Sequence, residues 1–199
     1  EQLCALSTRL SRDTAPYTDF GVWGPYGRRM QKAMRFTAQV FIGGELTTKA
    51  FRGPDSFVLW RACWRVFRTA LLMLHGAKAG QLDAYEEKMR GLAETFPDCW
   101  GILMAADDLM RSERWEEIRR RTEAERSGQG DRSSFGLGAR NPTAPWGDVI
   151  KASAEERGWW YEHVNQPALL STRGTGGHAT GPAASPAVLG PPGIWTPPP

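Results

Sequence analysis

The chain has 199 residues, of which 41% are hydrophobic and 24% charged, and its formal net charge is +3. This is enough for one globular domain with flexible segments, and nine Trp, eight Phe and four Tyr exclude disorder along the whole chain. The charge is well short of the strongly basic values that by themselves indicate a nucleic-acid-binding protein.

The cysteines and the apolar runs bear on the cellular location that we expect for the protein. Cys4, Cys63 and Cys99 are odd in number, far apart and without a CxxC motif, so we expect neither a disulfide framework nor a zinc site, and we expect an intracellular location, in the cytoplasm or nucleus. No apolar run approaches the roughly 20 residues of a membrane span, so no membrane partner is expected. The chain begins at Glu1 and its first methionine is Met30, which we interpret as a fragment of a longer protein.

The first third of the chain predicts a β-hairpin. Residues 1–19 are expected to form an N-terminal extension, in which residues 4–10 fit a short helical turn. Residues 35–42 and 45–51 are rich in β-branched and aromatic side chains, and Gly43-Gly44 between them is a two-residue connection that favours a hairpin. Because an isolated hairpin is only marginally stable, this one is expected to lean on the helices that follow.

A first long helix is predicted from about residue 57 to His75-Gly76. Asp55 or Ser56 can cap its start, and Gly76 suits a left-handed terminal residue. Its apolar residues recur at spacings of three and four and share one face, namely Phe57, Trp60, Trp64, Phe67, Leu71 and Leu74. We interpret this face as core. The alternative is a Trp-lined groove that binds a partner, which an exposed patch along Trp60, Trp64 and Phe67 would favour.

Two more long helices are expected in the same domain. The first covers residues 79–96, and its predicted buried face consists of Leu82, Tyr85, Met89, Leu92 and Phe96. The second covers residues 98–126, and its apolar pattern fades beyond Trp115 into a charged stretch that we expect to be solvated. Together with the hairpin, these helices define a predicted domain over residues 20–126.

The rest of the chain alternates between low-complexity segments and one short helix. Residues 127–145 are rich in Gly and Ser and are predicted to be a flexible linker. A short helix is expected over residues 146–166, and residues 167–199, which hold seven of the 14 prolines in their last 18 positions, are predicted to be a disordered tail. The expected fold class is therefore mainly α, a small bundle of three to four helices with an N-terminal β-hairpin and a disordered Gly/Pro-rich tail.

Catalytic and metal-binding patterns are scarce. Adjacent residues on a helix diverge by about 100°, so Asp107 and Asp108 do not face one ion together, and Asp108 and Arg111 are expected to form a surface pair. No histidine has a partner in a recognisable catalytic motif, and no phosphate-binding glycine loop follows a strand. Cys63 and Cys99, each next to a Trp, are interpreted as buried thiols. We expect no enzyme, no metal, no cofactor and no small-molecule substrate.

Basic residues provide the binding signal of the sequence. The candidate nucleic-acid-binding residues are Arg28, Arg29, Lys32 and Arg35, which cluster before and into the hairpin, and Arg61, Arg65 and Arg68, which form a stripe beside the apolar face of the first long helix. Any nucleic-acid contact would be largely electrostatic and sensitive to salt. The alternative is that the arginines pair with carboxylates of the later helices, with Asp83, Glu86, Glu87, Asp107 and Asp108 available.

Several segments resemble a recurrent Gag-like domain of predicted retroelement-derived proteins of dinoflagellate algae. The resemblance spans residues 20–169 and lies in FGVWGPYGRR (20–29), the hairpin, GPDSF (53–57), WRVFRTA (64–70), LDAYE (82–86), CWG (99–101), ADDLMRSERW (106–115), WGDVI (146–150) and NQPAL (165–169). It implies an assembly or adaptor segment that precedes Cys-rich nucleic-acid-binding knuckles. The sequence contains no such knuckle and no polymerase or protease motif.

Two hypotheses follow. The first is a non-enzymatic assembly or nucleic-acid-associated module of a mobile-element-derived protein, with RNA or DNA and a second copy of the chain as expected partners. The second is a helical protein–protein interaction domain whose Trp-lined groove receives a partner.

Overall fold

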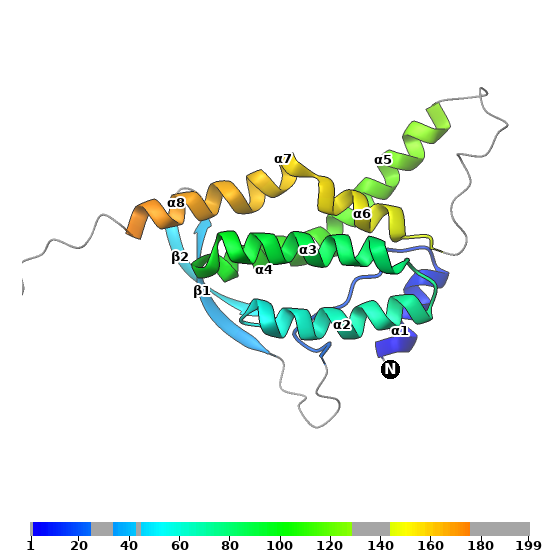
Figure 1. Ribbon diagram of the computed structural model, residues 1–199, viewed down its shortest axis with the longest axis horizontal. Helices are drawn as coiled ribbons and strands as arrows, with labels where there is room; N and C mark the ends of the chain where they lie inside the picture. Colours follow the sequence, from blue (N-terminus) through cyan, green and yellow to red (C-terminus); the bar gives the residue numbers. More distant parts are fainter. Residues whose placement is uncertain (1, 25–33, 43–44, 129–143, 176–199) are drawn as a thin grey trace, which may run out of the picture.

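The computed structural model describes residues 2–24, 34–42, 45–128 and 144–175. They form a mainly helical fold with a two-stranded antiparallel hairpin (Figure 1), which confirms the predicted fold class. The elements are α1 (Gln2–Ser11), β1 (Arg35–Ile42), β2 (Glu45–Arg52), α2 (Phe57–Met73), α3 (Ala79–Thr95), η2 (Pro97–Cys99), α4 (Trp100–Leu109), η3 (Met110–Arg114), α5 (Trp115–Gly128), α6 (Gly147–Glu155), α7 (Arg157–Trp160), η4 (Tyr161–Asn165) and α8 (Gln166–Thr175). Most of the predicted linker and tail lies outside the described residues.

The hairpin leans on the helices, as the sequence predicts. β1 pairs with β2 in a register that places Phe36 opposite Phe51, and the two rings stack with their centroids 5.3 Å apart and pack against the core. β1 lies against α4 and α8, and the hairpin closes one end of the helical layers (Figure 1). Burial of this aromatic pair is what stabilises an otherwise marginal two-stranded sheet.

Helix α2 begins at Phe57, as expected, and the way it ends differs from the prediction. Ser56 occupies the N-cap position, but its side chain makes no capping hydrogen bond. At the other end, the left-handed residue is His75, with φ of 52°, and not Gly76. A glycine at position 76 has a different advantage, because a Cβ there would lie 3.0 Å from Leu71 and 3.2 Å from Leu10, so both leucines would have to shift. The absence of a side chain lets the chain pass close to both leucines.

The third predicted helix is interrupted by a π-helical turn. Helices α4 and α5 are joined by η3, Met110–Arg114, in which one extra residue is accommodated. The turn explains the apolar pattern, because Met110 and Trp115 are five residues apart and yet both are fully buried. In a regular α-helix, the residue that shares a face with Met110 would be Arg114. The π turn rotates Trp115 back to the core.

Two predictions are wrong for the C-terminal arm, which comprises α6, α7, η4 and α8 (residues 147–175). The expected single short helix is broken at Glu156, whose ψ of 75° is not helical, and it contains a second π-helical turn, η4. The expected disorder from residue 167 is wrong for residues 167–175, which lie in α8. Ala168 is fully buried, because a small side chain lets α8 approach its neighbours closely.

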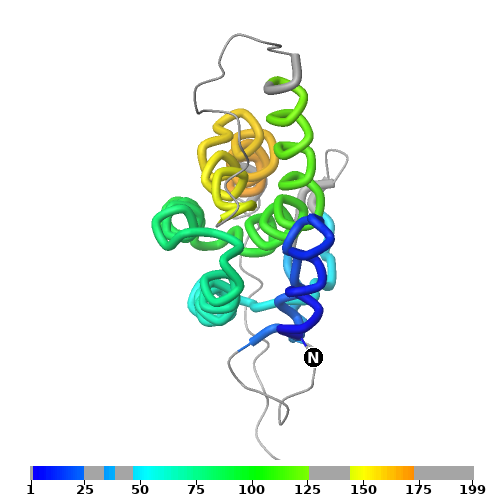
Figure 2. Tube along the Cα trace, turned by 90° about the vertical axis from the view of Figure 1, so that its right-hand side faces the viewer, coloured from blue at the N-terminus to red at the C-terminus, as the bar shows by residue number. Residues whose placement is uncertain are grey.

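One core joins all of these elements. Its buried side chains run from Leu6 in α1 to Ala168 in α8. Figures 1 and 2 show the arm lying along α3 and the α4–α5 helix, with α2 and α3 side by side. The N-terminal extension and the segment after the linker are therefore parts of the same packed unit as residues 34–128.

Candidate functional site

The predicted arginine stripe on α2 is largely neutralised by α3. The Nε of Arg61 donates to Glu86 at 2.7 Å, and the Nε of Arg68 donates to Asp83 at 2.8 Å. For these two residues the pairing interpretation is confirmed, since each guanidinium has its carboxylate on the neighbouring helix. Arg65 lies between them, is exposed, and forms no ion pair in the part of the chain that the structure describes.

The other predicted cluster lies at the base of the hairpin. Arg35 and Arg52 are opposite each other in the strand register and both are exposed. Asp19 pairs with Arg52 at 3.2 Å. The backbone N–H of Met34 donates to the carbonyl of Gly21 at 2.9 Å, so the described residues on both sides of segment 25–33 meet here. Arg28, Arg29 and Lys32 belong to that segment and lie outside the described residues.

The aromatic stripe of α2 forms core and no groove. Trp60, Trp64 and Phe67 are each 0% exposed. The Trp60 and Trp64 rings stack with centroids 5.2 Å apart, and Trp64 also stacks on Tyr85 of α3 at 5.1 Å. Their complete burial counts against a partner groove along these three residues, since the rings of Phe20, Tyr85 and Trp115 pack against them.

The cysteines behave as small apolar side chains. Cys63 and Cys99 are buried, as predicted, and Cys4 is exposed. Burial raises the pKa of the Cys63 thiol to about 11 and also raises that of Cys99. A thiol with a raised pKa is a poor nucleophile at neutral pH, so neither buried cysteine has the character of a catalytic group.

Asp108 and Arg111 form the expected pair, but its expected position at the surface is wrong for Arg111. Arg111 is fully buried, and its principal partner is Asp107, also fully buried, with the Nη2 atom 2.8 Å from Oδ2. Asp108 is farther away, at 3.7 Å. The guanidinium also donates to the carbonyl of Thr18 at 2.7 Å and lies 3.9 Å from the centre of the Phe20 ring. This buried pair fastens residues 18–20 to α4 and η3.

Two tyrosines extend the buried pair. The Tyr85 hydroxyl donates to Asp107 at 3.1 Å, and the Tyr17 hydroxyl donates to Asp108 at 2.8 Å. Burial, together with the neighbouring carboxylates, raises the pKa of both phenols well above the ordinary value. Both tyrosines are therefore neutral hydrogen-bond donors near neutral pH, and the cluster is structural.

A surface pocket of about 380 Å³ lies between the α4–α5 helix and the C-terminal arm. Both π-helical turns contribute to its wall. Its lining consists of Leu109, Glu113, Arg114, Glu117, Trp159, Glu162 and His163. Because π-helical turns are frequent at functional sites, the meeting of two of them at one pocket makes this the candidate site that sequence reasoning missed.

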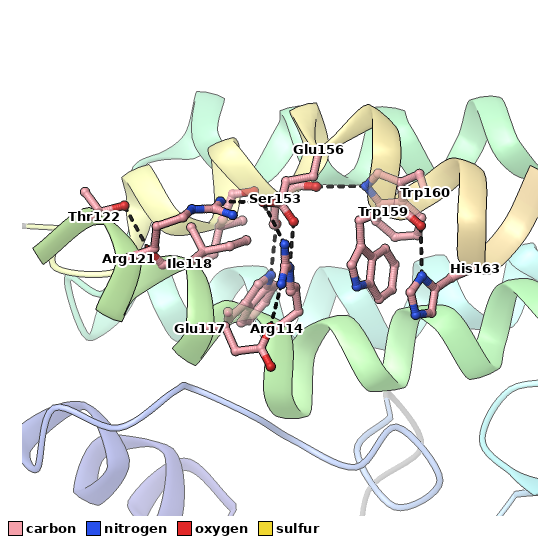
Figure 3. A network of polar contacts seen from close by, with 12 residues as sticks. Arg114, Glu117, Ile118, Arg121, Thr122, Ser153, Glu156, Trp159, Trp160 and His163 are labelled. Carbon is pink, nitrogen blue, oxygen red and sulfur yellow. Dashed lines mark hydrogen bonds and ion pairs between the residues drawn. The ribbon is translucent and has the colours of Figure 1, made fainter. Parts of the chain in front are cut away.

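The arginine of this pocket is fully engaged by carboxylates (Figure 3). Arg114 makes a bidentate contact to Glu156, with Nε 2.7 Å from Oε2 and Nη2 3.2 Å from Oε1, and its Nη1 donates to Glu117 at 2.6 Å. Arg121 also donates to Glu156. Burial alone would raise the pKa of Glu156, but hydrogen bonds from Arg114 and Arg121 hold it below its ordinary value.

The opposite wall is aromatic. The Trp159 and His163 rings stack with centroids 4.1 Å apart and an interplanar angle of 7°, and Figure 3 shows both pointing from the arm toward the α4–α5 helix. The Nδ1 atom of His163 lies 3.0 Å from the carbonyl oxygen of Trp159. Because a carbonyl only accepts, Nδ1 carries the proton, and in the neutral ring Nε2 is an acceptor.

Metal and membrane sites find no support among the described residues. No group of three or more His, Cys, Asp or Glu side chains in the described ranges is placed to hold a metal ion. None of the described helices is both long enough and apolar enough to cross a bilayer.

The chain was compared with protein-family models, with curated proteins and with solved structures. No family model matches it, and neither a curated protein nor a solved structure does.

Proposed function

We propose that the chain is a non-enzymatic module that associates with nucleic acid through the base of its hairpin and serves in the assembly of a retroelement-derived protein. The hairpin base is defined by Arg35 and Arg52. The observation that carries the proposal is the position of these two arginines, directly opposite each other on an exposed face.

Like charges directly opposite in an antiparallel pair are destabilising. Asp19 offsets Arg52 at 3.2 Å, and no ion pair to Arg35 is found in the described part of the chain. A bound phosphate would relieve the repulsion, because a guanidinium donates to phosphate oxygens through two parallel N–H groups. The pair therefore favours an anionic partner.

The sequence has three further basic residues shortly before Arg35. Lys32 precedes Arg35 by three residues. Arg28 and Arg29 belong to the same segment, whose flanking residues Gly21 and Met34 are hydrogen bonded. The resemblance of residues 20–169 to a Gag-like domain supports the same proposal.

The experiment measures fluorescence anisotropy of labelled single-stranded RNA and duplex DNA at several salt concentrations. Arg35→Ala/Arg52→Ala is expected to weaken binding about tenfold and to lower the salt slope for duplex DNA by about 1.8, the value for two lost phosphate contacts. The matched control, Arg61→Ala/Arg68→Ala, removes the same charge from arginines that already have carboxylate partners. Equal losses in the two double variants would show a response to net charge only and would contradict the proposal.

Assembly is tested separately by sedimentation equilibrium of the full chain. The proposal expects a concentration-dependent rise in mass, alone or with nucleic acid. A chain that stays monomeric and ignores both nucleic acids at low salt would overturn it.

A further inference from the structure

The charged residues that line the pocket between the two π-helical turns favour a cationic ligand over an anionic one. One arginine and three glutamates line it, which gives a net charge of −2 with His163 neutral. The arginine is Arg114, and its guanidinium is already bound by Glu156 and Glu117. An anionic ligand would meet uncompensated repulsion here, whereas a cation is attracted.

The groups that remain free at the pocket are acceptors. Glu113 and Glu162 are exposed and form no hydrogen bond or ion pair with the described residues. The third acceptor is the Nε2 atom of neutral His163, since Nδ1 is used by the carbonyl of Trp159. A ligand that pairs with these acceptors must have several N–H donors. A metal ion does not fit, because the described carboxylates do not converge as metal ligands do.

The aromatic residues of the pocket further restrict the chemical class of the ligand. The Trp159 and His163 rings are half-buried and nearly parallel, with centroids 4.1 Å apart, and the Trp160 ring is nearly perpendicular to that of Trp159, with centroids 4.9 Å apart. These contacts hold the Trp159 ring in one orientation. A planar cation beside an ordered indole gains a cation–π contact, and a guanidinium combines that planarity with five N–H donors.

We propose that this pocket is a binding site for an alkylguanidinium group, which lies against Trp159 and donates to Glu113 and Glu162. The group is carried either by an arginine side chain of a polypeptide or by a free small molecule. The site shares no residue with the hairpin base, so it stands or falls independently of nucleic-acid binding.

The test is a titration of the full chain, followed by ¹H–¹⁵N spectra, with three probes. The first is the peptide acetyl-Gly-Arg-Gly-amide, the second is agmatine, and the third is the same peptide with citrulline, which keeps the shape of arginine and removes its charge. Saturable shifts are expected at the Trp159 indole and at the amides of residues 109–117 and 159–163, with either guanidinium probe and not with citrulline. Tighter binding of the peptide assigns a polypeptide ligand, and tighter binding of agmatine assigns a free one.

A pair of double variants tests the two carboxylates. Glu113→Gln/Glu162→Gln is expected to weaken binding of the guanidinium probe about fivefold or more, because two charged acceptors become neutral. Both residues are exposed, so the folded spectrum is retained. The matched control, Glu87→Gln/Glu94→Gln, changes two exposed glutamates of α3 that do not line the pocket, and it should leave affinity unchanged.

Three results would overturn the proposal. They are the absence of saturable shifts at the pocket with either guanidinium probe, equal shifts with citrulline, and equal losses of affinity in the two double variants.

Discussion

Arg111 and Arg114 belong to the same π-helical turn, yet they lie in opposite environments. Arg111 is completely buried with Asp107, whereas the Arg114 side chain is 25% exposed and borders the candidate pocket. Three residues of sequence therefore separate a fully buried ion pair from one that borders the candidate pocket. Access to water, and not the presence of paired charges, distinguishes the two environments.

The largest effect is expected from breaking the buried pair. Arg111→Ala leaves the Asp107 carboxylate in the core with the Tyr85 hydroxyl as a remaining donor, and the cost is about 3–5 kcal/mol of unfolding free energy. Urea unfolding followed by circular dichroism measures it. Arg90→Ala, which removes two exposed ion pairs on α3, is the control and should change stability little. A similar, small change in both variants would contradict the structural role of Arg111.

A smaller effect is expected at the pocket. Arg114→Ala removes the bidentate contact to Glu156 and the contact to Glu117, but water reaches this network and Arg121 remains on Glu156. The expected loss is about 1–2 kcal/mol, measured in the same urea experiment. A loss as large as that of Arg111→Ala would erase the distinction between the two arginines.

The smallest effect is the acid response of the same network. Because the pKa of Glu156 in the fold lies below its ordinary value, its ionised form stabilises the protein above the unfolded pKa of about 4.3, and this contribution is lost as the pH falls through the folded pKa. The stability difference between the wild type and Glu156→Gln should therefore shrink from pH 7 toward pH 3. Urea midpoints across this range measure it, and a constant difference would contradict the assignment.

Regular spacing made the long helices predictable. Apolar residues of α2 and α3 recur at spacings of three and four, and Gly or Pro residues lie near the ends of both helices. The apolar spacing and the helix-breaking residues therefore predict the same helix bounds. The hairpin was predictable because its strands differ in composition from the Gly-Gly between them. In these elements, local chemistry and tertiary packing favour the same structure.

The errors have identifiable physical causes. Arg111 was expected at the surface because a lone charge is costly to bury, and the signal that reverses this is Asp107 four residues earlier on the same face. The five-residue spacing between the apolar residues Met110 and Trp115 is the sequence feature that indicates the π-helical turn. Helix α8 was missed because its core contact is a small alanine, Ala168. The pocket is lined by residues about fifty positions apart in the sequence, such as Glu113 and His163. A local sequence pattern does not predict contacts over such a separation.

The salt dependence of nucleic-acid binding by the wild-type chain tests the central claim most directly. The logarithm of the association constant for duplex DNA is expected to fall linearly with the logarithm of salt concentration, with a slope steeper than about −1.8 because Arg35, Arg52 and their neighbours displace condensed counterions. The slope should flatten in Arg35→Ala/Arg52→Ala and persist in Arg61→Ala/Arg68→Ala. A wild-type chain that shows no binding at low salt, or a slope that Arg35→Ala/Arg52→Ala leaves unchanged, would contradict the account.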